Sequence, residues 1–276
     1  MAARFALLCG AFLATLMLGT GTTWWLTPQS DALDAEPAAL PRPPLPIRIS
    51  HSAEYEHCLA AIADDPQRAI ELSDAWRARA GEPEAVHCSA LAYLATGDFA
   101  LGASHLERLG RSPTLPDLER AIVFSQSVEA RLLSGDPERA LEDADEALRL
   151  VPPTTGLLIL RASASLTLGR SAAAVDDLTE ALYLDNQRQD AMVMRATALR
   201  DLDRLDEAAA DLEHALGLVP DDPEALLERG ILRQRRGDTA GAREDWQRVR
   251  ALTSTGLVAD LADQNLALLD AGPLRR

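Results

Sequence analysis

The sequence contains no lysine. All 27 of its basic residues are arginines, set against 43 aspartates and glutamates, so the formal net charge is −16. Schiff-base chemistry on a lysine and a lysine-dependent P-loop are therefore excluded. Binding to a nucleic-acid backbone needs dense cationic contacts, which an acidic chain does not offer. We expect no nucleic-acid partner.

Aromatic residues are also scarce, at 4% of the 276 residues, whereas apolar residues make up 47%. Alanine and leucine supply most of the apolar content, and both are strong helix formers. Because alanine also lets helices approach closely, this composition favours close-packed helices and argues against wholesale disorder. We expect an all-α fold.

Catalytic and metal-binding motifs are missing. The sequence has no G-x-S-x-G, H-E-x-x-H, Walker or dinucleotide-binding pattern. His57-Cys58 and His87-Cys88 are zinc-ligand types, but adjacent residues on a helix point about 100° apart and do not converge easily on one ion. We therefore expect a protein that is not an enzyme and that holds no cofactor and no metal.

An uncharged stretch runs from residue 5 to residue 26, between Arg4 and Asp31, and ends after Trp24-Trp25. In a helix it would span roughly 33 Å, enough to cross a bilayer core, with the tryptophans at the interface. Residues 1–26 are expected to be a signal peptide or a membrane anchor. We favour the anchor, because no Ala-x-Ala cleavage site follows. The protein is then expected in the periplasm, held to the inner membrane by residues 5–26; a cleaved signal would leave it soluble there.

Five prolines crowd the next stretch: Pro37, Pro41, Pro43, Pro44 and Pro46. Such a segment favours polyproline II and acts as a semi-rigid spacer. Residues 27–49 are therefore expected to be a Pro-rich linker between the membrane and a folded body.

The body repeats every 34 residues. Several columns keep this spacing over four copies, which predicts one helix-turn-helix unit per repeat. Gly or Asp suits the turn, and small residues on the second helix allow close packing. The turn column is Gly135, Gly169, Asp203 and Gly237; the small columns are Ala140, Ala174, Ala208 and Ala242, and Ala147, Ala181 and Ala215; the closing column is Leu150, Leu184, Leu218 and Leu252.

This pattern resembles the tetratricopeptide repeat (TPR) family. The small eighth residue (Ala162, Ala196, Gly230), the small twentieth and the proline at position thirty-two (Pro152, Pro220) carry the resemblance. The usual aromatic at position four is matched only by Phe124. The resemblance implies a superhelical solenoid over residues 50–254 with about six repeats, at 50–82, 83–120, 121–154, 155–188, 189–222 and 223–254, and a capping helix at 255–270, since a solenoid must cover its last apolar face.

An arginine column and an aspartate column also repeat at this spacing, sixteen residues apart. They pair Arg161 with Asp177, Arg195 with Asp211, and Arg229 with Asp245. One interpretation is that the repeated arginines form a row of ligand-binding side chains. We favour structural ion pairs that join the two helices of each repeat.

Cys58 and Cys88 fall on the first helices of the first two repeats. First helices of adjacent repeats pack side by side, so Cα atoms about 6 Å apart are feasible. Outside the cytoplasm such a pair tends to oxidise. We expect a disulfide, with two unpaired buried thiols as the alternative.

The TPR register implies that certain first-helix positions face an inner groove that binds a partner peptide. They mix apolar and polar groups, as a peptide groove would, although each could also serve packing or solvation. They are Ser125, Glu129, Ile159, Ser163, Val193, Thr197, Arg200, Leu227, Ile231, Gln234 and Arg235.

The predicted function is a non-catalytic scaffold or adaptor of the bacterial cell envelope. It would bind partner proteins or peptides through the groove and contact the membrane only through the N-terminal helix. The alternative is an accessory subunit of an envelope enzyme or of a maturation complex, in polysaccharide, cell-wall or cofactor assembly. The all-arginine, exported character is typical of proteins from high-GC Gram-negative bacteria.

Overall fold

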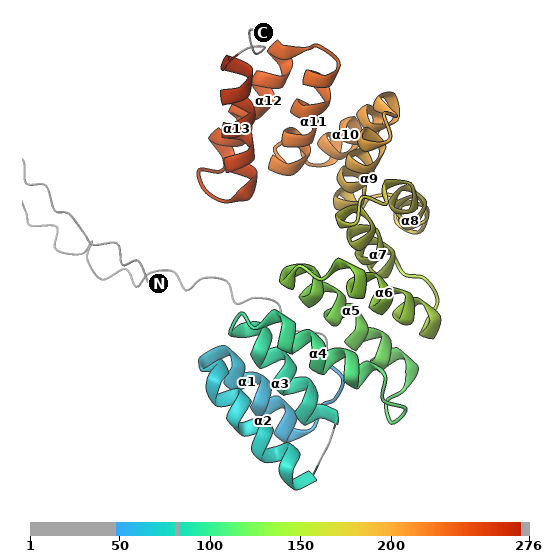
Figure 1. The fold of residues 1–276 in the computed structure, drawn as a ribbon, viewed down its shortest axis with the longest axis vertical. Coiled ribbons are helices and arrows are strands. Elements are labelled where there is room, and N and C mark those ends of the chain that lie inside the picture. The colour runs from blue at the N-terminus through green and yellow to red at the C-terminus, as the bar shows by residue number, and fades with distance from the viewer. Residues whose placement is uncertain (1–47, 81–82, 272–276) are drawn as a thin grey trace, which may run out of the picture. The chain divides into compact units, whose positions relative to one another are not determined.

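The structure is a computed structural model that describes residues 48–80 and 83–271. Within these residues it contains thirteen helices and no strand (Figure 1). No helix among them is both long and apolar enough to cross a bilayer. The expected anchor and residues 27–47 of the expected linker lie outside the described residues. The helices are α1 (Ala53–Asp64), α2 (Pro66–Ala80), α3 (Pro83–Ala95), α4 (Phe99–Gly110), α5 (Asp117–Ser134), α6 (Pro137–Leu150), α7 (Thr155–Thr167), α8 (Ser171–Leu184), α9 (Gln189–Asp201), α10 (Leu205–Leu218), α11 (Pro223–Arg235), α12 (Thr239–Leu252) and α13 (Leu257–Ala271).

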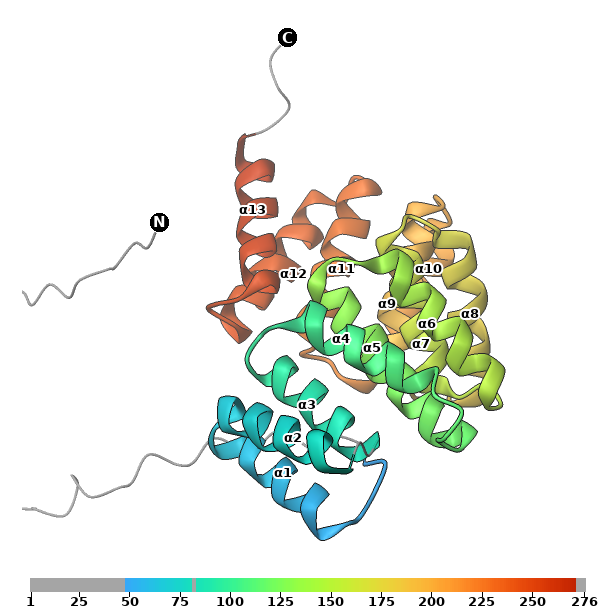
Figure 2. The ribbon, with the colours of Figure 1, turned by 60° about the horizontal axis from the view of Figure 1, so that its bottom comes forward.

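The helices form six hairpins, from α1–α2 to α11–α12, and α13 follows them. The second helix of each hairpin also packs against the first helix of the next, so the hairpins stack in chain order (Figure 2). Neighbouring first helices contact each other as well, between α1 and α3 and from α5 to α13. Neighbouring second helices make no comparable contacts within the described residues. The row of first helices is therefore the more tightly packed side of the stack.

One residue in the left-handed conformation follows the first helix of five hairpins. Glycine adopts this conformation without strain because it has no Cβ, and aspartate is one of the few other residues that tolerate it. Asp203, with a φ of 61°, is the only described non-glycine residue with a positive φ. The shared turn explains why a turn residue recurs every 34 residues after the third helix hairpin begins: Gly135, Gly169, Asp203 and Gly237.

Small residues allow the helices of a hairpin to approach closely. The alanines of both repeated columns are fully buried. On α11, a Cβ added to Gly230 would lie only 2.3 Å from Nε1 of Trp246 on α12. The indole of Trp246 is itself fully buried and donates to the backbone oxygen of Leu227 at 3.2 Å. Gly230 therefore leaves the space that Trp246 fills.

Two boundaries differ from the sequence prediction. Arg48 and Ile49, which the prediction gave to the linker, belong to the folded body: Ile49 is 8% exposed within the core, and Arg48 pairs with Glu56 at 2.6 Å. The third repeat was expected from residue 121, but α5 begins four residues earlier, at Asp117. Pro116 stands directly before it, and the acidic first turn suits a helix N-terminus. The helix therefore takes up part of the loop that the sequence suggested.

Candidate functional site

Arginine–aspartate pairs join the two helices of the last three hairpins. Arg161 on α7 donates from Nε and Nη2 to the two carboxylate oxygens of Asp177 on α8, at 2.9 and 2.5 Å. The same geometry recurs in Arg195–Asp211, at 2.8 and 2.7 Å, and in Arg229–Asp245, at 3.0 and 2.7 Å. Two parallel bonds from a planar guanidinium to a buried carboxylate hold both side chains in one orientation. The pairs therefore fix each hairpin internally.

The third guanidinium nitrogen reaches the preceding hairpin. Arg161 Nη1 donates to Asp145 on α6 at 3.1 Å, and Arg195 Nη1 donates to Thr179 on α8 at 3.3 Å. Each of these arginines stands on a first helix and bridges the second helices on either side of it. The hydrogen bonds to Asp177 raise the pKa of Arg161 above its usual value. Arg161 and Arg195 are therefore staples, side chains that join neighbouring repeats as well as the two helices of one hairpin.

The third hairpin is stapled by different residues. Ser127 occupies the arginine position and donates to Asp143 at 2.6 Å, while Arg131, one turn later, donates to the same carboxylate at 2.9 Å. Arg131 also pairs with Glu107 on α4 and so links two hairpins. Burial raises the pKa of Asp143 in spite of these bonds. Sequence reasoning missed Arg131, although Arg233 occupies the same column three repeats later.

Buried polar side chains connect the first three first helices. Tyr55 Oη on α1 lies 2.5 Å from Nδ1 of His87 on α3, and Nε2 of His87 lies 2.6 Å from Oε1 of Gln126 on α5. Burial lowers the pKa of His87 to about 4 and raises the pKa of Tyr55. The ring of His87 is therefore neutral at pH 7, accepting from Tyr55 at one nitrogen and donating to Gln126 at the other.

Cys58 and Cys88 lie beside these polar groups. Contact between α1 and α3 brings their Cα atoms to 6.3 Å, with the two sulfur atoms at bonding distance. Both side chains are buried. The structure thus places the two cysteines together; their oxidation in the protein stays a prediction. Elsewhere in the described residues, no group of three or more His, Cys, Asp or Glu side chains is placed to hold a metal.

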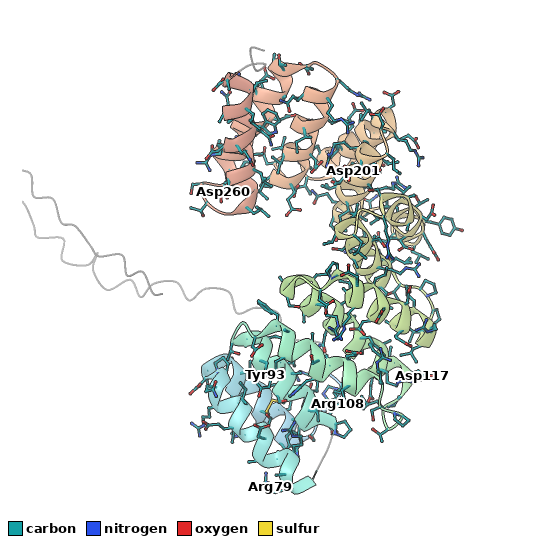
Figure 3. All side chains as sticks on the ribbon, viewed as in Figure 1. Arg79, Tyr93, Arg108, Asp117, Asp201 and Asp260 are labelled. Atoms are coloured by element: carbon teal, nitrogen blue, oxygen red, sulfur yellow. A yellow bond between two sulfur atoms is a disulfide. The ribbon has the colours of Figure 1, made fainter. Side chains whose placement is uncertain are left out.

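The predicted groove residues all lie on first helices, but both arginines among them are engaged between two of these helices. Arg200 Nε donates to Glu228 at 3.1 Å, and Arg235 Nη1 donates to the backbone oxygen of Arg200 at 2.7 Å. These arginines tie α9 to α11, beside Asp201, which Figure 3 labels. Among the predicted groove residues, Glu129 and Arg235 are exposed, and Ile159, Val193 and Leu227 are buried in the core. The others are partly buried: Ser125, Ser163, Thr197, Arg200, Ile231 and Gln234. Ile231 packs against the main core.

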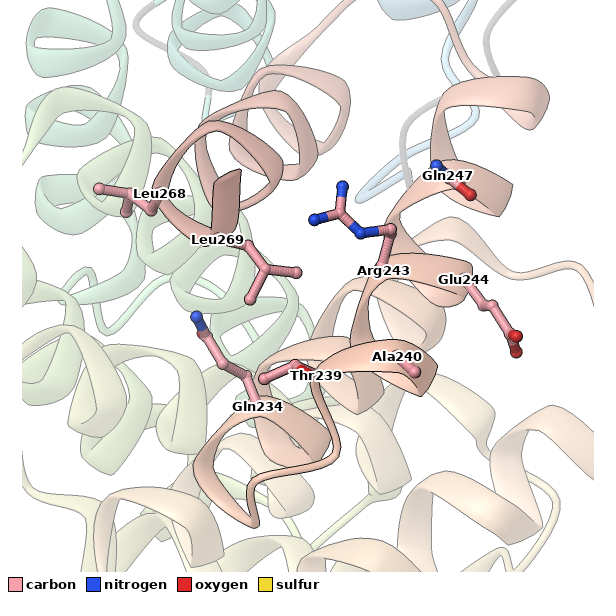
Figure 4. A pocket seen from close by; sticks show the side chains of 8 residues that line it. All are labelled: Gln234, Thr239, Ala240, Arg243, Glu244, Gln247, Leu268 and Leu269. Carbon is pink, nitrogen blue, oxygen red and sulfur yellow. The ribbon is translucent and has the colours of Figure 1, made fainter. Parts of the chain in front are cut away.

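A pocket of about 920 Å³ lies among α11, α12 and α13. Figure 4 shows Leu269, Arg243 and Gln234 pointing toward the same space from these three helices. Arg243 also pairs with Asp270 of α13. Gln234 is the only predicted groove residue among those that line it; the full lining is Gln234, Thr239, Ala240, Arg243, Glu244, Gln247, Leu268 and Leu269. The sequence pattern gave no signal for this pocket, because the spacing of α13 from α12 decides it.

Residues 193–254 match the sequence profile described as tetratricopeptide repeat. The match covers most of α9 and all of α10, α11 and α12, with two of the three arginine–aspartate pairs. Over these residues the chain is similar to the tetratricopeptide repeat family. The described helices as a whole form an all-helical, TPR-like solenoid.

Solved structures share this TPR fold at low sequence identity. YrrB, a TPR protein with an unusual peptide-binding site, is 14% identical, with a TM-score of 0.54, over 72% of this chain and 100% of its own. A chain of the Cut9–Hcn1 hetero-tetramer of the APC/C is 14% identical, with a TM-score of 0.59, over 77% of this chain and 42% of its own. MamA is 15% identical, with a TM-score of 0.50, over 64% of this chain and 95% of its own. No curated protein sequence matches the chain.

Proposed function

We propose that the protein is a non-catalytic scaffold that holds a segment of a partner protein against its row of first helices. The stapling of the hairpins carries this proposal. Arg131, Arg161 and Arg195 bridge successive second helices, so α5, α7 and α9 between them are held in fixed register. A preorganised surface loses little conformational freedom on binding. The peptide-binding site of YrrB, which has the same fold, supports this use of the repeats.

The cell envelope is the proposed location. The uncharged stretch at residues 5–26 and the prolines that follow support export and a spacer. The juxtaposed Cys58 and Cys88 add a second argument, because paired cysteines are typical of oxidising compartments. The proposal is thus a TPR scaffold outside the cytoplasm, tethered through its N-terminal helix.

The test is co-purification of the full chain from solubilised membranes, with two variants. Ser163→Trp places a bulky ring on the first-helix row, and Ala172→Trp places the same ring at an exposed position of α8. We expect the original chain and Ala172→Trp to retain a protein partner that Ser163→Trp loses. Equal retention by both variants would contradict the proposed surface. Co-purification of a single enzyme, in an amount equal to that of the protein, would identify the protein as an accessory subunit.

A further inference from the structure

On the first helices from α5 to α11, the arginines have partners within the chain, whereas several glutamates do not. Every arginine on α5, α7, α9 and α11 donates to an acceptor of the same chain. By contrast, Glu119, Glu129 and Glu224 of these helices have no ion-pair partner among the described residues. Glu119 and Glu224 lie near helix N-termini, where the helix dipole stabilises a carboxylate. Glu129 is in the middle of α5 and has no such support.

Glu129 stands on one face of α5 with Ser125 and Leu133, each one helical turn away. Leu133 is 67% exposed, so its apolar side chain is open to contact by a partner. Glu129 is exposed too, yet burial by its surroundings raises the pKa of its carboxyl. A charged group that is reachable but partly desolvated gains more from a counter-ion than a fully solvated one.

The neighbouring first helix offers no counter-ion. α7 contacts α5, and its residues at the positions of Glu129 and Leu133, one repeat later, are Ser163 and Thr167. Both are uncharged hydroxyl residues. The α5 face therefore combines an unpaired carboxylate, an exposed leucine and small polar neighbours, and lacks a cation.

We propose that the α5 face, defined by Ser125, Glu129 and Leu133, binds a partner segment that carries a cationic side chain next to an apolar one. The cation pairs with Glu129, and the apolar side chain covers Leu133. This inference rests on the proposed scaffold function and specifies the partner. Because no arginine of the first helices is free, an acidic segment would meet no counter-charge there.

The experiment uses the full chain and an array of ten-residue peptides with a central Arg-Leu, citrulline-Leu or Glu-Leu pair in randomised flanks. Citrulline keeps the shape of arginine without its charge. We expect Arg-Leu peptides to bind best and Glu129→Gln to weaken that binding by about fivefold. Glu180→Gln removes the same charge from an unpaired, exposed position of α8 and is expected to change binding less than twofold.

A second variant, Leu133→Ser, is expected to weaken the same peptides without changing the preference for arginine over citrulline. Equal losses in Glu129→Gln and Glu180→Gln would overturn the inference, because the effect would then be general charge attraction. Equal binding of Arg-Leu and citrulline-Leu peptides, or no binding on the array, would also overturn it. These outcomes do not decide the scaffold function. A protein partner that is retained in the co-purification supports that function whatever charge the partner carries.

Discussion

Arg195 on α9 donates two hydrogen bonds to Asp211 on α10 and a third to Thr179 on α8. One side chain therefore holds three helices of two repeats. Such a contact acts on the array at two levels, because it closes a hairpin and joins it to its neighbour. The stability of the array and the register of its first helices depend on the same staple.

Asp211→Ala is expected to destabilise the protein by about 2–3 kcal/mol, because it leaves the guanidinium of Arg195 partly buried without its partner. Thermal unfolding followed by circular dichroism measures the effect. The matched control is Glu207→Gln on the same helix, which breaks the exposed pair with the N-cap residue Arg204. Such surface pairs contribute little, so the control should melt with the original chain. An unchanged melting temperature in Asp211→Ala would contradict the structural role of the pair.

Gly230→Ala is expected to cost about 1–3 kcal/mol, because its Cβ would collide with the fully buried indole of Trp246. Gly217, on α10, has open space around it. Gly217→Ala should therefore stabilise the protein by about 0.5–1 kcal/mol through its better helix propensity. Denaturant unfolding of both variants checks the pair. A stabilising Gly230→Ala would mean that Trp246 does not pack as described.

The Cys58–Cys88 disulfide is tested by mass spectrometry of the native, exported protein under non-reducing conditions. A loop closed over a separation of 30 residues is expected to contribute about 3–4 kcal/mol. The double variant Cys58→Ser, Cys88→Ser should therefore unfold at lower denaturant than the oxidised protein, and reduction should shift the original chain in the same direction. Two alkylatable thiols at these positions would rule the disulfide out.

Stability is expected to fall between pH 6.5 and about pH 4 because of His87. Burial holds its pKa at about 4 in the folded protein, whereas the unfolded chain binds the proton near pH 6.5. Acidification therefore favours the unfolded state, by about 3 kcal/mol over this range. The unfolding free energy of His87→Gln, measured against pH, should lose this component of the slope. Parallel pH profiles for the two proteins would show that His87 does not titrate in this way.

The periodic part of the fold could be predicted from the sequence. The turn, alanine and arginine–aspartate columns are local or recur at a fixed spacing, so one copy explains the others. Side chains that leave the pattern were not predicted. Arg131 replaces the missing arginine from one turn later, and Ser89 with His105, 3.0 Å apart, takes the place of the ion pair in the second hairpin. A loop longer by four residues hides that correspondence.

The candidate site was predicted less well than the fold. The register indicates which first-helix positions share a side, but it does not say which partners they meet. Arg200 and Arg235 were expected in the groove and are engaged between α9 and α11. The contacts from Tyr55 to His87 and on to Gln126 join residues 32 and 39 positions apart, with no repeated spacing to reveal them. The repeat register places Glu129 in the groove, but only the structure shows that it has no ion-pair partner among the described residues.

Hydrogen–deuterium exchange of the full chain, with and without the partner from the co-purification, tests the scaffold most directly. Amide exchange slows where a bound segment stabilises the backbone. We predict slower exchange in α5, α7, α9 and α11, with little change in α6, α8, α10 and α12. Slowing confined to the second helices, or no slowing in the stack, would contradict binding at the row of first helices.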